Sequence, residues 1–342
     1  MVSSRATLKD VAIKSGYALR TVKKVMSGNE NVRTKTRISV LNAAKELNYQ
    51  RNIAASVLSR RKSVQVAIVY AEVSEGYFPE VERGFMQCAK ELRDFGLSIE
   101  FHKAFVQDVD AQVDALKRLA ADESVDGVII QPVSSSQLNS HIDDFINSGR
   151  PLLTFGADAP LSKRLAYIGP DAYRSGRIGA QILANYIGKR GNVVVISSNF
   201  EHSQTKDRIS GFQDRVKEHY PKINVKSLHV PTFEPKAYYE FVRTLVCAGE
   251  PVRGIFATNA NSYIAGEVLR DLRRDDIIVV GFDISNMATE IMKEGYLKVL
   301  IEQNPFQIAY LTLKAMFNRI YLNEQTPPIQ HTPLSIVTSE CL

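Results

Sequence analysis

Apolar residues follow two different periods in the two parts of the chain. In the first 50 residues they recur every three or four positions, which predicts short helices. From Val64 onward the pattern changes to continuous apolar runs, which are separated by amphipathic stretches of about 10–18 residues. The runs are VQVAIVYA, DGVIIQP, RPLLTFG, NVVVISS, RGIFATN, DDIIVVGFD and LKVLIE. Such an alternation predicts parallel sheets with both faces covered by helices, and its length favours two α/β lobes over one open sheet.

Two short helices with a glycine between them are predicted near the N-terminus. Thr7 and Asp10 have the spacing of a capping box at the start of the first helix, and Ser15-Gly16 ends it. The second helix is predicted from Leu19 to Met26. Two helices around a tight glycine turn are typical of a helix-turn-helix motif.

A third helix is predicted from about Lys35 to Leu47, with Ile38, Leu41, Ala44 and Leu47 facing inward. Three such helices can bury one small core and leave the outer face of the second helix exposed. That face contains Arg20, Lys23 and Lys24, at spacings that place them close together.

The charge distribution indicates a partner for this N-terminal part. Residues 1–62 contain 14 Lys and Arg against 3 Asp and Glu, whereas the remainder contains 29 against 34. A strongly basic segment that also has periodic apolar residues predicts a folded unit that binds a polyanion. An arginine can bind guanine with two hydrogen bonds, and a lysine can reach guanine or phosphate. The alternative is a helix that is basic only for solubility.

The segments TLKDVAIKSGYALRTVKKVMSG and VRTKTRISVLNAAKELNYQRNIAASVLS resemble the N-terminus of the LacI/GalR family of bacterial transcription regulators. The resemblance implies a homodimer that binds a pseudo-palindromic double-stranded operator DNA, most simply as the repressor of a carbohydrate-utilisation operon. Leu19 and Arg20 occupy the family's two specificity positions. The DNA-binding residues that the resemblance implies are Thr7, Leu19, Arg20, Thr21, Lys23, Lys24, Asn29, Asn52, Ala55 and Leu58. Tyr17-Ala18, Lys23-Lys24 and Arg51 depart from the family pattern, so the operator sequence does not follow from the resemblance.

The same resemblance divides the chain into a small all-α helix-turn-helix head, a hinge and an effector-binding and dimerisation core. The expected boundaries are 1–50, 51–63 and 64–342, and the core is expected to be similar to two-lobed periplasmic sugar-binding proteins. We expect lobe one to contain residues of about 64–165 and 303–325, and lobe two residues of about 166–302 and 326–342. The hinge is short and would be a marginal helix alone. Leu58 matches the family's leucine that enters the minor groove, although packing against the core is the alternative.

Polar and aromatic side chains follow the predicted strands of the core. Small ligands of parallel sheets bind beyond the carboxyl ends of the strands, so these residues are candidate ligand groups. They are Tyr77, Phe78, Arg208, Asn259, Asp283 and Gln303. Carboxylate, amide and guanidinium groups beside aromatic rings suit a small neutral polyol, most simply a monosaccharide. The family often has a hydroxyl-binding aspartate where Gly156 stands, so Asp158 is added to the candidates.

Each of these residues also has a structural explanation. Asn259 and Asp283 could cap helices, and Arg208 could pair with a surface carboxylate. Tyr77 and Phe78 could pack at a helix start. A purine, a nucleoside or a partner protein is the alternative effector for the same DNA-binding architecture.

The sequence contains no candidate catalytic, metal or cofactor motif. Its three cysteines are scattered, its six histidines have no paired spacing, and no G-x-S-x-G or phosphate-binding loop occurs. No apolar run of 18 residues and no N-terminal signal pattern occurs, so a cytoplasmic protein is expected. A sugar-binding protein without a role on DNA, or a sugar-metabolic enzyme with a DNA-binding head, remains a less favoured alternative.

Overall fold

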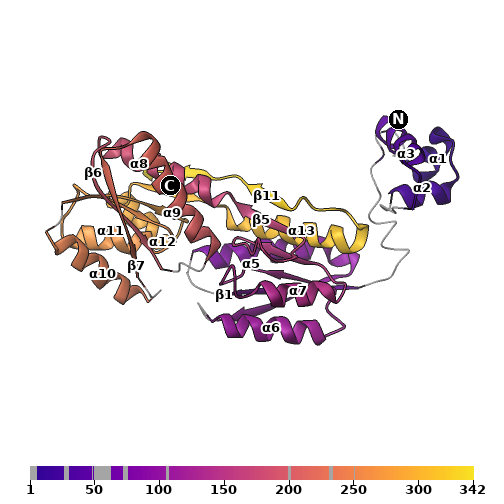
Figure 1. Cartoon of the computed structure of the whole chain (residues 1–342), viewed down its shortest axis with the longest axis horizontal. Coiled ribbons are helices and arrows are strands. Elements are labelled where there is room, and N and C mark those ends of the chain that lie inside the picture. The colour runs from indigo at the N-terminus through magenta and orange to yellow at the C-terminus, as the bar shows by residue number, and fades with distance from the viewer. Residues whose placement is uncertain are drawn as a thin grey trace.

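The computed structural model describes residues 6–26, 31–47, 49, 63–71, 76–104, 108–198, 202–230, 234–249 and 251–342. A head of short helices precedes a core built on two six-stranded sheets (Figure 1). Helices cover both faces of each sheet, so the core has two α/β lobes. The predicted fold class is confirmed.

The helices of the head begin and end close to their predicted positions. They are α1 (Leu8–Ser15), α2 (Leu19–Met26) and α3 (Thr34–Glu46). The capping box is present, since the Thr7 side chain accepts the Asp10 N–H while the Asp10 carboxylate accepts the Thr7 N–H. Gly16 has a φ of 73°, the left-handed conformation that favours glycine and lets the chain turn into α2.

The predicted inner face of α3 is wrong in part. Ile38 and Leu41 are 55% and 47% exposed, whereas Val40, Ala43 and Ala44 are buried against α1 and α2. Both sets of residues have helical spacing, and the small alanines allow the helices to approach closely. The choice between the two stripes is therefore made by packing and not by the period.

The first sheet has the strand order β11-β5-β4-β3-β1-β2, with parallel pairing throughout. Helices α5 and α13 cover one face, and α6 and α7 cover the other. The strands are β1 (Val64–Ala71), β2 (Leu97–Ala104), β3 (Gly127–Ile130), β4 (Leu152–Phe155), β5 (Ala166–Pro170) and β11 (Ile329–Thr332). The helices are α5 (Tyr77–Leu92), the short η1 (Arg93–Phe95), α6 (Val109–Ala121), α7 (Asn139–Asn147) and α13 (Pro305–Leu322).

The second sheet has the order β12-β10-β9-β8-β6-β7, and only β12 is antiparallel to its neighbour. Helices α8 and α9 cover one face, and α10 to α12 cover the other. The strands are β6 (Gly191–Ser197), β7 (Ile223–His229), β8 (Val252–Ala257), β9 (Ile278–Phe282), β10 (Val299–Glu302) and β12 (Ser335–Val337). The helices are α8 (Ala172–Tyr186), α9 (Ser203–His219), α10 (Pro235–Cys247), α11 (Ser262–Asp271), α12 (Asn286–Lys293) and η2 (Ser339–Cys341).

The predicted division between the lobes is wrong for two strands. Residues 166–170 and 326–332 were assigned to lobe two, but β5 pairs with β4 and β11 pairs with β5 in the first sheet. The chain therefore crosses between the lobes after β5, after β10 and after β11. An apolar run predicts a strand, but it does not say which sheet offers that strand a free edge.

Candidate functional site

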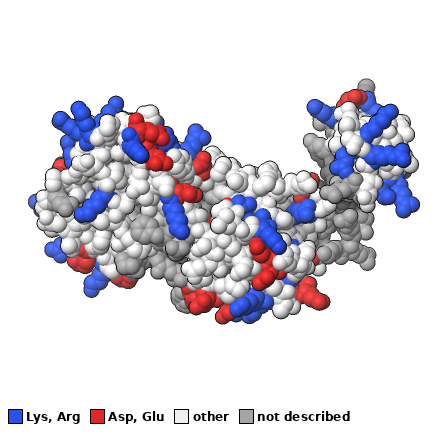
Figure 2. All heavy atoms as spheres, viewed as in Figure 1, with Lys and Arg blue, Asp and Glu red and all other residues white. Residues whose placement is uncertain are grey.

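The outer face of α2 presents the basic residues that the sequence placed there. Arg20, Lys23 and Lys24 are exposed, while Val22 and Val25 are buried in the core of the head. Leu19 and Thr21 are half-buried at the edge of this face. Ala18 contributes only its carbonyl oxygen to the start of α2, because it has no hydroxyl. Figure 2 shows Lys and Arg side chains gathered on the visible face of the head.

Thr7 uses its hydroxyl in the cap of α1, where the oxygen lies 2.7 Å from a carboxylate oxygen of Asp10. Its predicted role at the DNA backbone stays a prediction. The remaining predicted DNA-binding residues, Asn29, Asn52, Ala55 and Leu58, lie outside the described residues, as does most of the predicted hinge.

In the core, Arg208 is the centre of a buried polar network. It projects from α9, is 3% exposed, and its guanidinium lies 3.7 Å from the ring centre of Phe282. One terminal nitrogen donates to the Thr258 carbonyl at 2.5 Å, and the other donates to Gln303 Oε1 at 2.5 Å. Arg208 therefore contacts the ends of two strands. Among the described residues it pairs with no surface carboxylate, contrary to the alternative explanation from the sequence.

Gln303 connects Arg208 to Asp283. The Gln303 amide nitrogen donates to Asp283 Oδ1 at 2.7 Å, and both side chains are at least nine-tenths buried. Gln303 follows β10 and Asp283 follows β9, so the neighbouring ends of two parallel strands bring these residues together. The result is a continuous chain of hydrogen bonds from Asp283 through Gln303 to Arg208.

The environment of Asp283 changes its acidity. Burial, and then the charge of Glu302, raises the pKa of Asp283 to about 7, while Arg208 and Gln303 act in the opposite direction. Burial also raises the pKa of Glu302. Hydrogen-bond donors near a buried carboxyl group stabilise its charged form and so offset the effect of burial. Hydroxyl groups of a ligand are suitable donors.

Asn259 lies just after the neighbouring strand β8. Among the described residues, no hydrogen bond joins its side chain to this network. Its amide nitrogen donates to Ser198 Oγ at 3.0 Å, and its carbonyl oxygen accepts the Asn261 N–H at 3.1 Å. The second contact is a local turn bond and not the helix cap of the structural explanation, because the N-cap position of α11 is Asn261. Asn259 is half-buried, so its side chain joins the loops after β6 and β8.

The two aromatic candidates lie in different environments. Phe78 is 3% exposed and stacks on Tyr70 with ring centres 5.2 Å apart, so it is part of the core of lobe one. Tyr77 is 7% exposed, and its hydroxyl has no hydrogen-bond partner among the described residues. Burial, and then the charge of Asp283, raises the pKa of Tyr77 above its ordinary value. Of the two aromatic candidates, Tyr77 is therefore the one whose polar group, the hydroxyl, could bind a ligand.

The Asp158 carboxylate is fully engaged by neighbouring residues of the same segment. Both of its carboxylate oxygens pair with Arg164, at 2.5 and 2.6 Å, and one also accepts the Thr154 hydroxyl at 2.8 Å. The site that the family's aspartate would occupy is filled, because a Cβ on Gly156 would lie 2.8 Å from the Tyr77 hydroxyl and from Gln131 Nε2. Asp158 is therefore removed from the candidate ligand groups.

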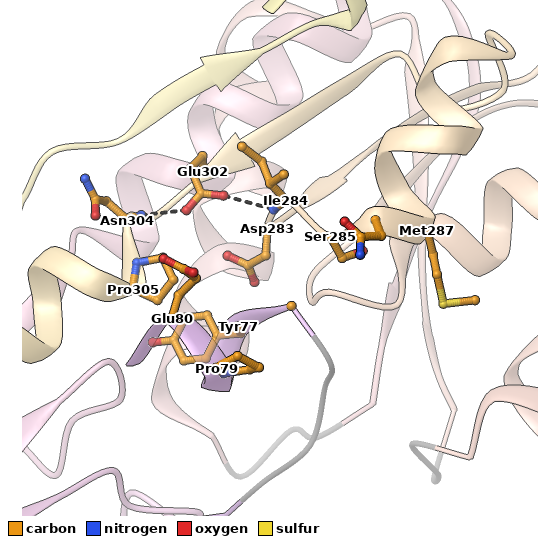
Figure 3. A pocket seen from close by; sticks show the side chains of 12 residues that line it. Tyr77, Pro79, Glu80, Asp283, Ile284, Ser285, Met287, Glu302, Asn304 and Pro305 are labelled. Atoms are coloured by element: carbon orange, nitrogen blue, oxygen red, sulfur yellow. Dashed lines mark hydrogen bonds between the residues drawn. The ribbon is translucent and has the colours of Figure 1, made fainter. Parts of the chain in front are cut away.

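A pocket of about 570 Å³ lies beside Asp283 (Figure 3). Its walls come from the start of α5, the loop between β9 and α12, and the crossover after β10. The lining includes Tyr77, Glu80, Asp283, Ser285 and Glu302. The pocket thus lies where the two lobes face each other.

Sequence reasoning missed several residues of the site. Gln204 accepts from Arg208 at 3.1 Å and donates to the Gly156 carbonyl of lobe one. It lies one helical turn before Arg208, a spacing that could have indicated a shared face. Glu302 directly precedes Gln303, but no motif marks it. Its role depends on the loop that folds against it.

Two further observations bear on the class of protein. Among the described residues, no group of His, Cys, Asp or Glu could hold a metal ion. Within the same part of the chain, no helix is both long and apolar enough to cross a membrane.

Comparisons with known proteins agree with this architecture. Residues 66–323 match the periplasmic binding protein domain, and residues 7–52 match the lacI family of bacterial regulatory proteins. The HTH-type transcriptional regulator RegA of Clostridium saccharobutylicum is 24% identical over 336 residues, which cover 95% of this chain and 96% of RegA. The ribose import binding protein RbsB of Bacillus subtilis is 22% identical over 260 residues, which cover 75% of this chain and 81% of RbsB.

Solved structures show the same fold. The glucose-galactose binding protein GanP of Geobacillus stearothermophilus has a TM-score of 0.76 at 23% identity, covering 82% of this chain and 99% of GanP. A solute binding protein of Burkholderia graminis in complex with D-arabinose also has a TM-score of 0.76, at 22% identity, covering 82% of this chain and 96% of that protein. With a lacI-type head on a core of the periplasmic binding protein domain family, the chain belongs to the LacI family of DNA-binding transcriptional regulators.

Proposed function

We propose that this regulator binds a pseudo-palindromic operator as a homodimer and represses genes of carbohydrate use until a monosaccharide or polyol binds between its lobes. The α2 face with Leu19, Arg20, Lys23 and Lys24 would read the major groove. In this proposal the effector contacts Arg208, Asp283 and Gln303 from lobe two and Tyr77 from lobe one.

The observation that best supports an effector site is the buried chain of hydrogen bonds between Asp283, Gln303 and Arg208. Burying a guanidinium, a carboxyl group and an amide is costly unless every polar atom finds a partner. Yet the Arg208 Nε and the Tyr77 hydroxyl have no partner within the described part of the chain. Tyr77 lines the pocket beside Asp283, so a ligand hydroxyl group there would supply its missing partner. Arg208 lies behind Asp283 and Gln303, and a ligand would have to reach past the pocket lining to contact its Nε.

The names of related proteins suggest which sugars to test first. RbsB is named for ribose import, and two solute binding proteins of the same fold were solved with D-arabinose. We propose a pentose or a closely related monosaccharide as the first class of effector. In this proposal Asn259 helps to form the effector site by joining the loops after β6 and β8.

The effector proposal is tested by thermal-shift screening of the full chain against pentoses, hexoses, polyols and nucleosides. A ligand that binds only the native state raises the melting temperature with the logarithm of its concentration. Titration calorimetry of the best ligand, with and without operator DNA, then tests the coupling. Because coupling between two sites is reciprocal, DNA must change sugar affinity by the same factor as sugar changes DNA affinity. Equal sugar affinities in the two titrations would exclude allosteric control.

The DNA-binding proposal is tested through Arg20. Arg20→Ala is expected to cost about 1–3 kcal/mol of operator binding and to relax selectivity at one base pair. The logarithm of affinity should also fall linearly with that of salt concentration, at a slope of roughly −0.9 per phosphate contacted. Fluorescence anisotropy on operator variants measures both quantities. Light scattering measures the predicted dimer, and unchanged selectivity in Arg20→Ala would contradict the assignment of α2.

A further inference from the structure

Glu302 lies where the chain leaves lobe two. It is the last residue of β10, Gln303 follows it, and Asn304 caps α13 of lobe one by accepting the Gln307 N–H. The three consecutive residues therefore connect the end of a strand, the polar network and the crossover between the lobes. A substitution at Glu302 is therefore expected to affect the strand end, the polar network and the crossover together.

The Glu302 carboxylate holds two backbone N–H groups. One oxygen accepts from Ile284 at 2.9 Å, and the other accepts from Asn304 at 2.8 Å (Figure 3). Two residues at this site have left-handed backbone, Asp283 with a φ of 64° and Asn304 with a φ of 56°. The Ile284 N–H directly follows Asp283 in the chain, and the other N–H belongs to Asn304 itself. Left-handed backbone is unfavourable for residues other than glycine, although Asp and Asn tolerate it best, so support from the surroundings still stabilises it. Charge-assisted hydrogen bonds are strong enough to give that support.

We propose that Glu302 is the positioning residue of the effector site, because it fixes the backbone that turns the Asp283 carboxyl group toward Gln303. The inference rests on the proposed function for its effect on a sugar, but the orientation of Asp283 is a property of the protein alone. Gln303 is held between the two left-handed residues, so its amide reaches Asp283 on one side and Arg208 on the other.

The charge of Glu302 has a second effect on the same group. Among the described residues, the ionisable side chains that influence Asp283 are Glu302, Arg208 and Tyr77, and Glu80 in turn influences Glu302. Glu302 and burial raise the pKa of Asp283 to about 7, whereas Arg208 lowers it. Because its pKa is raised, Asp283 loses its charge, and with it its strongest acceptor capacity, at a higher pH than an ordinary aspartate does. Sugar affinity should therefore rise with pH through neutrality.

Carbon-13 NMR of aspartate carboxyl groups tests the inference without any ligand, with Asp283→Asn to assign the resonance. Glu302→Gln keeps the size but removes the charge and one of the two acceptors, so the pKa of Asp283 should fall. Glu302→Asp keeps the charge but shortens the side chain, so the pKa should stay raised. Glu290→Gln, on the exposed face of α12, removes a carboxylate that contacts neither loop and is the matched control. An unchanged Asp283 pKa in Glu302→Gln would overturn the inference.

Calorimetry with D-ribose and D-arabinose tests positioning. Both Glu302→Gln and Glu302→Asp should weaken sugar binding at pH 8 by roughly tenfold, the effect of one lost hydrogen bond to a charged group. Only Glu302→Gln should also move the pH midpoint of affinity downward. Sugar affinity equal to that of the unmodified protein in both variants would overturn the positioning role. If no sugar binds the unmodified protein while its Asp283 pKa responds as expected, the proposed function fails and the effect of Glu302 on Asp283 stands.

Discussion

The two lobes contribute to the site in different ways, although they share one architecture. Lobe two supplies Arg208 from α9, and Asp283 and Gln303 from the ends of β9 and β10. Hydrogen bonds join the three side chains through Gln303. In lobe one, Phe78 belongs to the core, Asp158 is paired with Arg164, and Gly156 leaves no room for a side chain. Tyr77 provides a buried polar atom of that lobe that has no partner among the described residues and lies at the pocket.

This difference indicates a prebuilt polar surface on one lobe and a mostly apolar cover on the other. Buried polar groups that satisfy one another stay in place without a ligand, so little ordering is needed when the ligand arrives. The cover then needs only shape and one or two polar contacts. Variants in lobe two should therefore affect ligand binding most, and variants in lobe one should mainly affect closure.

The largest effect is expected for Arg208→Ala. The change leaves the Thr258 carbonyl and the Gln303 amide oxygen without their donor, at about 1–3 kcal/mol for each unsatisfied group. Effector affinity should fall by at least about a hundredfold, and the free energy of unfolding should fall by a few kcal/mol. Calorimetry and urea unfolding measure the two losses. Lys217→Ala removes an exposed cation from the same helix and should change neither by more than about 0.5 kcal/mol.

A smaller loss is expected for Asp283→Ala. The Gln303 amide loses one acceptor and the ligand loses its carboxylate, so affinity should fall by about 10- to 100-fold while the fold persists. Asp275→Ala removes an exposed aspartate of the same lobe and is the matched control. Circular dichroism verifies the fold. Full sugar affinity in Asp283→Ala would contradict the assignment of this residue.

Gly76→Ala tests how closely lobe one must approach lobe two. A Cβ at this position would lie 2.8 Å from both the Ile284 carbonyl oxygen and the Ser285 Cβ of lobe two. Because Gly76 has a φ of −89°, alanine is compatible with its backbone, and the conflict lies between the lobes. Overpacking of this kind costs about 1–3 kcal/mol, so effector affinity should fall roughly tenfold. Ser285→Gly in the same chain removes one of the two contacts and should restore part of the affinity.

The smallest effect is expected for Tyr77→Phe, and its sign differs between two measurements. Removing a buried hydroxyl that has no partner should leave the free energy of unfolding unchanged or raise it by up to about 1 kcal/mol. Effector affinity should fall several-fold, since the ligand loses the Tyr77 hydroxyl as a hydrogen-bond partner. Thermal unfolding and calorimetry on the same sample test both signs. A lower melting temperature with unchanged affinity would mean that Tyr77 is purely structural.

Much of the fold could be predicted because local patterns mark it clearly. The central strands β1, β3, β4, β6, β8 and β9 are continuous apolar runs, since they are buried on both faces. The edge strands β2 and β7 were not identified, because half of their residues or more are partly or fully exposed and their pattern is broken. Helices α1 and α2 were found at their observed ends, because a capping box and a left-handed glycine mark them.

The sequence by itself determined the helix-turn-helix head, the basic face of α2, and the positions of Arg208, Asp283 and Gln303 after their elements. These follow from period, charge and the rule that strand ends meet at one edge of a sheet. Only the tertiary structure decided that β5 and β11 complete the first sheet, that Asp158 pairs with Arg164, and that Glu302 supports Asp283. Local sequence fixes the conformation of a segment. Which groups become partners depends on segments that are distant along the chain and meet only after folding.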